Sequence, residues 1–298
     1  MSDLSLDATQ LDRYSRHVIM DEVGPEGQAR LLEGSVLVVG AGGLGSPVVQ
    51  YLAAAGVGRL GIVDDDVVER SNLQRQVVHK DADVGRPKVE SAADYVRALN
   101  PDVTVEPYDR RLTADSIDEI ARDFDVICDA SDNFGTRYLC NDYAVLTGTP
   151  LSHGAIYRFE GQVTTFVNDR PSSDREPSDR EPNDRERTDD EADEDGPCYR
   201  CLFREAPEPG TVPDCATTGV LGVLPGTVGC IQATEVVKCL TGIGDLLDGR
   251  LLLYDAASMT FETVPVLADP DCPVCGESPA IESVAEASYE DRCAIGAD

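Results

Sequence analysis

A glycine-rich segment, Gly40-Ala41-Gly42-Gly43-Leu44-Gly45, most constrains how this chain can fold. It fits the pattern G-x-G-x-x-G, follows an apolar run over 35–39 and precedes a stretch of helical character over 46–56. A second β-rich run, 59–63, then ends at Asp64. Strand, glycine turn, helix and strand predict a βαβ unit whose backbone N–H groups approach phosphates at the helix N-terminus. A turn that is merely tight is the alternative explanation of the glycines.

The rest of the chain first alternates helices with strands and then changes to consecutive strands. Alternation predicts a parallel sheet covered by helices on both faces, and consecutive strands predict an antiparallel extension. We therefore expect an α/β fold, a Rossmann-like doubly wound sheet with an antiparallel C-terminal extension. The further predicted elements are helices at 11–33, 88–99, 116–123, 133–147 and 226–240, and strands at 103–108, 126–128, 151–157, 162–167, 251–254 and 260–264, with a turn at Gly161.

These patterns divide the chain into four parts: an N-terminal helical arm (1–33), a nucleotide-binding Rossmann-like part (34–150), a second part (151–276) and an acidic tail (277–298) that we expect to be loose. Within the second part, residues 169–195 repeat the motif DREPS, DREPN, DRERT and show no apolar periodicity. This segment contains 13 acidic residues and 5 arginines. It predicts a solvated, disordered insert, and a specific binding role is the alternative.

The charge of the 298-residue chain is strongly negative, −31, from 56 acidic against 25 basic residues, of which only three are lysines. Such a surface repels nucleic acid and is tolerated where salt is molar and the Debye length is about 3 Å. It predicts the cytoplasm of an extreme halophile. Hydrophobic residues make up 41% of the chain, which excludes a wholly disordered protein. The polar N-terminus and the absence of a long apolar run predict neither a secretory signal nor a membrane span.

Polar and cationic residues follow the second strand of the βαβ unit. Asp64, about twenty positions after the glycines, can accept hydrogen bonds from ribose hydroxyls. Arg75 and Lys88 suit nucleotidyl transfer better than hydride transfer, because charge builds on the α-phosphate and on the leaving pyrophosphate. Surface salt bridges are the alternative role of these two cations. The residues of this segment that we expect at the site are Asp64, Asp66, Ser71, Asn72, Arg75 and Lys88.

The segment Asp129-Ala130-Ser131-Asp132-Asn133 ends a predicted buried strand. In open α/β sheets, ligands bind at this carboxyl edge. Asp132 is therefore a candidate ligand of Mg²⁺, which takes one or two carboxylates together with phosphate oxygens and waters. The alternative is that Asp132 only caps the helix that starts at Asn133.

Two of the sequence's cysteine motifs have the form C-x-x-C: Cys198 with Cys201, and Cys272 with Cys275. Four thiolates in two such pairs suit tetrahedral Zn²⁺ with no open position, so they predict a structural zinc site. Redox chemistry or a disulfide is the alternative. Cys215 differs because it lies in a polar loop, where it is either a nucleophile or a bystander.

Together and in this order, the motifs resemble those of the MoeB/ThiF family, relatives of the ubiquitin-activating enzymes. Arg13-Tyr14-Ser15-Arg16-His17, Gly85-Arg86-Pro87-Lys88 and Gly161-Gln162 extend the resemblance over nearly the whole chain, apart from the insert and the tail. With the halophilic composition, it points to the haloarchaeal members that activate small archaeal modifier proteins. The resemblance implies ATP-dependent adenylation of the C-terminal glycine of ubiquitin-like or sulfur-carrier β-grasp proteins ending in Gly-Gly. Protein conjugation and sulfur transfer, in tRNA thiolation and molybdopterin synthesis, are the implied uses.

The resemblance also implies roles for single residues. Arg16 would reach the ATP of a neighbouring subunit, which implies a homodimer, and Cys215 would accept the acyl group as a thioester. Residues 34–150 would bind ATP, and residues 151–276 the carrier protein. The implied catalytic residues are Cys215, Arg75, Lys88, Asp132 and Arg16. The implied ATP and Mg²⁺ contacts are Gly40, Gly42, Gly43, Gly45, Asp66, Ser71 and Asn133, with Asp64 on the ribose, Asn72, Arg75 and Lys88 on the phosphates, and Asp132 on Mg²⁺.

Because the chain ends soon after the second cysteine pair, we expect no rhodanese-like domain and a separate protein as sulfur donor. Two other functions are weighed against adenylation. An NAD-dependent oxidoreductase would need a catalytic acid or base such as a histidine, and His17, His79 and His153 offer no clear candidate. A non-catalytic scaffold would be expected to lack site residues, whereas Arg75, Lys88 and Asp132 are all present.

Overall fold

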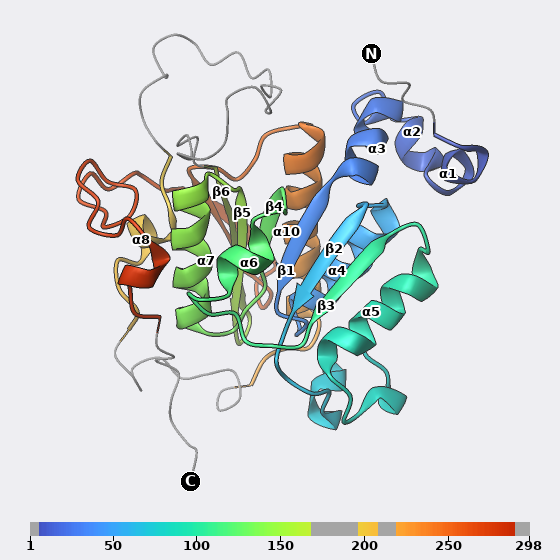
Figure 1. Ribbon diagram of the computed structural model, residues 1–298, viewed down its shortest axis with the longest axis horizontal. Helices are drawn as coiled ribbons and strands as arrows, with labels where there is room; N and C mark the ends of the chain where they lie inside the picture. Colours follow the sequence, from blue (N-terminus) through green and yellow to red (C-terminus); the bar gives the residue numbers. More distant parts are fainter. Residues whose placement is uncertain (1–5, 168–195, 208–218, 290–298) are drawn as a thin grey trace.

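The computed structural model describes residues 6–167, 196–207 and 219–289. Its central element is one eight-stranded sheet with the strand order β3-β2-β1-β4-β5-β6-β7-β8 (Figure 1). The five neighbouring strands β3, β2, β1, β4 and β5 are parallel. Strands β6, β7 and β8 continue the sheet, and each runs antiparallel to the strand before it. The predicted fold class is therefore confirmed. The strands are β1 (Ser35–Val39), β2 (Arg59–Val63), β3 (Thr104–Tyr108), β4 (Val126–Asp129), β5 (Leu151–Tyr157), β6 (Glu160–Phe166), β7 (Arg250–Asp255) and β8 (Thr260–Pro265).

Helices cover both faces of the sheet. Helices α3, α4, α5 and α10 pack on one face, and α6 and α7 pack on the other, where Figure 1 shows them in front of the strands. No helix in the described part of the chain has the length and apolarity that a bilayer crossing requires. The helices are α1 (Ala8–Arg13), α2 (Ser15–Val18), α3 (Gly24–Glu33), α4 (Gly45–Ala55), α5 (Lys88–Leu99), α6 (Ile117–Ala121), α7 (Phe134–Thr147), α8 (Tyr199–Leu202) and α10 (Leu224–Thr241), with 3₁₀ turns η1 (Arg70–Gln74), η2 (Asp81–Asp83) and η4 (Val284–Glu286).

Strand β1 shows why a continuous apolar run forms the centre of this sheet. Val36 and Val38 belong to the core beneath α4 and α10, whereas Leu37 and Val39 belong to the core beneath α6 and α7. Successive side chains of a strand point to opposite faces, so a strand covered on both sides must be apolar at every position. The sheet thus holds two cores, and its carboxyl edge is left for polar residues.

The predicted turn at Gly161 is wrong. Gly161 lies inside β6 and pairs with Ile156, and the hairpin reverses at Arg158–Phe159, where Arg158 has a φ of 53°. A Cβ on Gly161 would lie 2.4 Å from Cγ2 of Val228 in α10. Gly161 therefore allows α10 to pack closely against β6. The sequence alone does not distinguish a glycine required for such packing from a glycine required for a turn.

Part of the acidic tail is packed, which corrects the expectation that it is loose throughout. Val284 and Tyr289 pack against the core beneath α7. The Tyr289 hydroxyl donates a hydrogen bond of 2.9 Å to Oδ2 of the buried Asp142, which also pairs with Arg200. A buried carboxylate needs such donors, and the tail supplies one. The predicted insert, 169–195, lies outside the described residues.

Candidate active site

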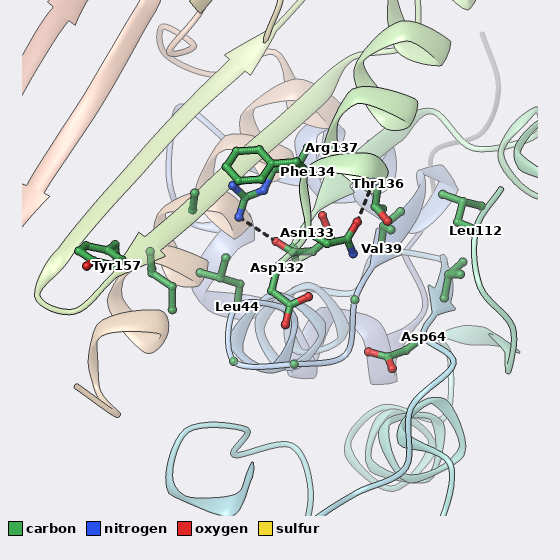
Figure 2. Close-up of a pocket in the computed structure, with 18 of the residues that line it drawn as sticks. Val39, Leu44, Asp64, Leu112, Asp132, Asn133, Phe134, Thr136, Arg137 and Tyr157 are labelled. Atoms are coloured by element: carbon green, nitrogen blue, oxygen red, sulfur yellow. Dashed lines mark hydrogen bonds between the residues drawn. The ribbon is translucent and has the colours of Figure 1, made fainter. Parts of the chain in front are cut away.

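A cavity of about 880 Å³ lies at the carboxyl edge of the parallel strands. Figure 2 shows the carboxylates of Asp64, which follows β2, and of Asp132, which follows β4, both reaching into it. Because β1 lies between β2 and β4, the residues that follow all three strands meet at one place. Of the predicted site residues, the cavity is lined by Gly40, Gly42, Gly43, Asp64, Asp66, Arg75, Lys88, Asp132 and Asn133.

The glycine loop joins β1 to α4 in a turn that only glycine permits at its two ends. Gly40 has a φ of +102°, and a Cβ there would lie 2.8 Å from the carbonyl oxygen of Ala130. A Cβ on Gly45 would lie 1.9 Å from the carbonyl oxygen of Gly40, so Gly45 closes the turn but does not line the cavity. The amides of Gly42 and Gly43 have no acceptor among the described residues. These amides can therefore donate to phosphate oxygens at the start of α4.

Asp64 connects the glycine loop to the cations of the site. Its Oδ2 accepts a hydrogen bond of 2.8 Å from the amide of Ala41, and its Oδ1 accepts one of 2.9 Å from the amide of Asp66. The buried ammonium of Lys88 lies 3.8 Å from Asp64 and 2.6 Å from Asp66. Burial raises the pKa of Asp64, and Lys88 partly opposes this. The carboxylate thus braces the loop and keeps lone pairs for a ligand in the cavity.

Basic side chains gather at the cavity, although the protein's net charge is −31. Sequence reasoning found two of them and missed the other three. Arg110 and Arg111 follow β3, the parallel neighbour of β2, and Arg137 lies in the first turn of α7. The carboxyl-edge rule that selected Asp132 would have found Arg110 and Arg111 too, but not Arg137, which lies within a helix. The basic residues lining the cavity are Arg75, Lys88, Arg110, Arg111 and Arg137.

Asn133, and not Asp132, caps helix α7. The side-chain oxygen of Asn133 accepts a hydrogen bond of 2.8 Å from the amide of Thr136 (Figure 2). The capping alternative for Asp132 is therefore wrong. The Asp132 side chain is exposed to the cavity, and its carboxylate accepts no hydrogen bond from a backbone amide within the described part of the chain. It remains available to a cation such as Mg²⁺ with a phosphate beside it.

A buried network fixes the loop that carries Asp132. Asp129 Oδ1 accepts hydrogen bonds from the amide and the hydroxyl of Ser131, at 3.0 and 2.6 Å. Asp129 Oδ2 lies 2.8 Å from Nδ1 of His153, whose ring packs 4.7 Å from that of Tyr199. Burial alone would raise the pKa of Asp129, but the hydrogen bond from His153, together with the nearby charges, outweighs it and holds the pKa below its usual value. Asp129 is thus an internal anion that organises the loop.

Besides Gly45, three predicted site residues in the described part of the chain do not line the cavity. Asn72 is buried, and its Oδ1 accepts a hydrogen bond of 3.0 Å from the amide of Glu69. The Ser71 hydroxyl donates to the carboxylate of Glu69 at 3.1 Å, and Arg16 is exposed on α2. Cys215 lies outside the described residues.

The two C-x-x-C pairs come together beside α7 as one cluster of four thiols that form no disulfide. Sγ of Cys198 lies 3.6 Å from Cys272 and 3.3 Å from Cys275, and Cys201 lies 3.4 Å from Cys275. Tetrahedral zinc with Zn–S bonds of about 2.3 Å requires sulfur separations of about 3.8 Å, so small shifts would suffice to admit the ion. The Asn141 amide and the backbone amide of Asp269 point at two of the sulfurs, as donors to thiolates do. The donor set fits a structural Zn²⁺.

A family model, that of the ThiF family, matches residues 14–274. The chain belongs to the ThiF family. This confirms the resemblance drawn from the motifs. This ThiF-family protein is 63% identical to the SAMP-activating enzyme E1 of Haloferax volcanii over 99% of both chains. It is 51% identical to the sulfur carrier protein adenylyltransferase of Thermus thermophilus, over 96% of this chain and 97% of the relative.

Other relatives extend beyond the part that this ThiF-family protein matches. It is 45% identical to the probable adenylyltransferase/sulfurtransferase MoeZ of Mycobacterium tuberculosis, over 99% of this chain but 68% of the relative. Among solved structures, it superposes on Escherichia coli MccB with a TM-score of 0.72 at 20% identity, over 89% of this chain and 75% of MccB. At this identity the likeness shows the fold.

Proposed function

We propose that the protein adenylates the C-terminal glycine of ubiquitin-like or sulfur-carrier β-grasp proteins at the expense of ATP. The observation that carries this proposal is the 63% identity, over 99% of both chains, to a protein named SAMP-activating enzyme E1. A relative at 51% identity is named a sulfur carrier protein adenylyltransferase. The presence of Arg75, Lys88 and Asp132 at one cavity supports an enzyme over a non-catalytic scaffold.

In this reaction, a carboxylate oxygen of the carrier attacks the α-phosphorus of ATP, and the bond to the bridging oxygen of the leaving pyrophosphate breaks. An ionised carboxylate needs no general base, so the protein must position the reactants and neutralise charge. The amides of Gly42 and Gly43 suit phosphate oxygens. Arg75 and Lys88 would offset the charge on the leaving pyrophosphate, and Asp64 would accept from the ribose hydroxyls.

Asp132 would hold Mg²⁺, which supplies positive charge at the phosphates. The exposed carboxylate suits an ion that keeps several waters and takes few protein ligands. The cysteine cluster would hold Zn²⁺ and so join the segment around α8 to residues 267–276. Tyr199, between two of the cysteines, also lines the cavity, so the zinc site supports one of its walls.

Three further assignments belong to the proposal. Residues 34–150 would bind ATP and residues 151–276 the carrier, whose acyl group Cys215 would accept. In that step the Cys215 sulfur attacks the acyl-adenylate carbonyl, the thioester forms, AMP leaves and the thiol proton passes to water. The protein would act as a homodimer in a halophile's cytoplasm, with Arg16 reaching the partner's ATP. Conjugation, tRNA thiolation and molybdopterin synthesis would consume the activated carriers.

ATP–pyrophosphate exchange in molar KCl tests the proposal, measured with and without a β-grasp protein ending in Gly-Gly. We expect carrier-dependent exchange that falls at least about 100-fold in Asp132→Ala, because Mg²⁺ and its charge are lost. Asp102→Ala removes an exposed carboxylate outside the cavity and should leave exchange unchanged. A folded, zinc-loaded protein that shows no exchange with such carriers would contradict the proposal and favour the scaffold.

A further inference from the structure

His79 contacts the glycine loop from the protein interior, and adenylation as proposed assigns it no role. The ring is 6% exposed and lies between η1 and η2. Its Nε2 is 2.9 Å from the carbonyl oxygen of Ala41, and its Nδ1 is 2.9 Å from the hydroxyl of Ser91 in α5. His79 therefore joins the second residue of the loop to a helix packed behind it.

The partners of the ring decide where its proton lies. A carbonyl oxygen only accepts, so Nε2 of His79 must carry a proton and donate it to Ala41. Burial, and secondarily the charge of Lys88, lower the pKa of His79 and favour the neutral ring. The Ser91 hydroxyl has one proton and two neighbours, Nδ1 of His79 at 2.9 Å and Oδ2 of Asp83 at 3.0 Å, and a carboxylate can only accept. With the ring neutral, Nδ1 competes with Asp83 for that proton. With the ring protonated, Nδ1 donates to Ser91 and Ser91 donates to Asp83, and in both states Nε2 keeps its bond to Ala41.

The bond to Ala41 fixes the direction of an amide that matters to a ligand. The Ala41 carbonyl and the Gly42 N–H belong to one planar trans peptide, so they point in opposite directions. With the carbonyl held inward by His79, the Gly42 N–H faces away from the interior, on the side where Gly42 lines the cavity. Asp64 holds the other side of Ala41, because it accepts from the Ala41 amide at 2.8 Å.

We infer that His79 is a positioning residue of the nucleotide site: its Nε2–H holds the Ala41–Gly42 peptide so that the Gly42 amide faces the phosphates of the bound nucleotide. This inference rests on the proposed function for the identity of that nucleotide, ATP. Without the bond, the peptide is free to rotate and to turn a carbonyl oxygen toward the phosphates. Binding must then also order the loop, and the entropy lost in doing so weakens the affinity for the nucleotide.

Two substitutions of His79 separate a positioning role from a merely structural one. In His79→Gln, the side-chain amide can take the place of Nε2 and donate to Ala41. In His79→Asn, the shorter amide takes the place of Nδ1, so it keeps Ser91 and loses Ala41. We expect the Kd for ATP with Mg²⁺, measured by calorimetry in molar KCl without carrier, to rise about tenfold in His79→Asn and less than about threefold in His79→Gln.

Tyr14→Phe is the matched control, because it also removes one buried hydrogen bond. The Tyr14 hydroxyl accepts that bond, of 2.8 Å, from the side-chain amide of Asn100 at the opposite edge of the sheet. This variant should leave the Kd for ATP unchanged. The KM for the carrier should change in none of the three variants. Equal ATP affinity in His79→Asn and wild type, or equal weakening in both His79 variants, would overturn the inference.

Failure of this inference can be told apart from failure of the proposed function. The Kd for ATP is measured without carrier, whereas the proposed function is tested by carrier-dependent exchange. A wild type that binds ATP and catalyses no exchange contradicts the proposed function alone, and the comparison of His79→Asn with His79→Gln still decides the role of His79. A wild type that binds no ATP contradicts both.

Discussion

At the residue scale, burial lowers the pKa of two histidines next to the site, His79 and His153. For His153, burial outweighs the opposing hydrogen bond and charge of Asp129. For His79, burial outweighs the bond to Ala41. Both rings are therefore neutral at neutral pH, and each has a single N–H whose partner is fixed by the structure. These two protons orient the glycine loop and the loop of Asp132.

From these directions, we expect the free energy of unfolding to fall as the pH is lowered from 7 to 5.5. An unfolded histidine binds a proton near pH 6.5, whereas the buried rings do so only at lower pH, so the unfolded state binds more protons in this window. Each such histidine contributes up to about 1.4 kcal/mol per pH unit. Denaturant unfolding of wild type and His153→Asn measures the effect, and the variant should show the shallower slope.

Zinc content must be measured at each pH in that series, because acid also releases metal from thiolates. At equal zinc content, identical slopes for wild type and His153→Asn would show that His153 does not cause the loss of stability. The side-chain amide of Asn takes the place of Nδ1, the ring atom that contacts Asp129, so the buried carboxylate keeps a partner in the variant. The comparison therefore isolates the titration of the ring.

At the scale of elements, the contact of α10 with the sheet depends on residues without a Cβ. A Cβ on Gly154 of β5 would lie 2.4 Å from Cδ of Gln232, and one on Gly161 of β6 would lie 2.4 Å from Cγ2 of Val228. We expect Gly161→Ala to lower the free energy of unfolding by about 1–3 kcal/mol, because the helix must shift. Denaturant unfolding of wild type and Gly161→Ala measures this difference.

Val228→Ala removes the methyl group that the new Cβ would meet, so it should rescue Gly161→Ala. In a double-mutant cycle, the two substitutions together should cost less than the sum of their separate costs by about 1 kcal/mol or more. Additive costs would show that the β6–α10 contact has room for a methyl group. Gly161 would then not be required for the close approach of α10 to β6.

The cysteine cluster acts at the same scale, because it joins segments with little regular structure. Residues 267–283 form no helix or strand, and the small core around the cluster is made of the cysteines, Val145 and Val274. We expect Cys201→Ser to lose zinc and at least about 3 kcal/mol of stability. Atomic emission for zinc and thermal unfolding check both. Cys230→Ser, on α10 and outside the cluster, should keep the metal, and full zinc in Cys201→Ser would exclude the four-thiolate site.

At the scale of the whole molecule, the proposed role of Arg16 in a partner's site makes a quantitative prediction. Arg16→Ala and Asp132→Ala should each be inactive in pyrophosphate exchange. After the two are unfolded, mixed in equal amounts and refolded, half of the dimers are mixed, and each mixed dimer has one site with both residues intact. About a quarter of the wild-type activity should therefore return.

No recovery in that mixture, with mixed dimers demonstrated by two affinity tags, would place Arg16 in the site of its own subunit or outside any site. The experiment requires high salt throughout. At a net charge of −31, subunits repel one another unless the Debye length is a few ångströms.

Much of this architecture was predictable because the sequence patterns are local. The limits of β1, β2 and β5 were predicted to the residue. For β1 and β2, apolar runs bounded by glycine or aspartate leave few alternatives. Asp132 was found because strand ends in a parallel sheet lie at one edge. Asp64 was found from its spacing after the glycines, and Lys88 because nucleotidyl transfer needs cations. The cysteine pairs were found because their spacing suits a metal. Each of these inferences uses residues that lie near one another in the chain, together with a general rule about how strands and helices or metal ligands are arranged.

The remaining features depend on which residues meet across the fold, and only the tertiary structure decided them. Gly161 is a glycine because α10 passes over it, and Tyr289 is ordered because Asp142 is buried beneath it. His79 has a role because the Ala41 carbonyl, 38 positions away, turns inward at that point. Composition and spacing determine which elements form and which chemistry is available. Packing determines which polar atom loses water, and it is the loss of water that forces a buried group to take a particular partner.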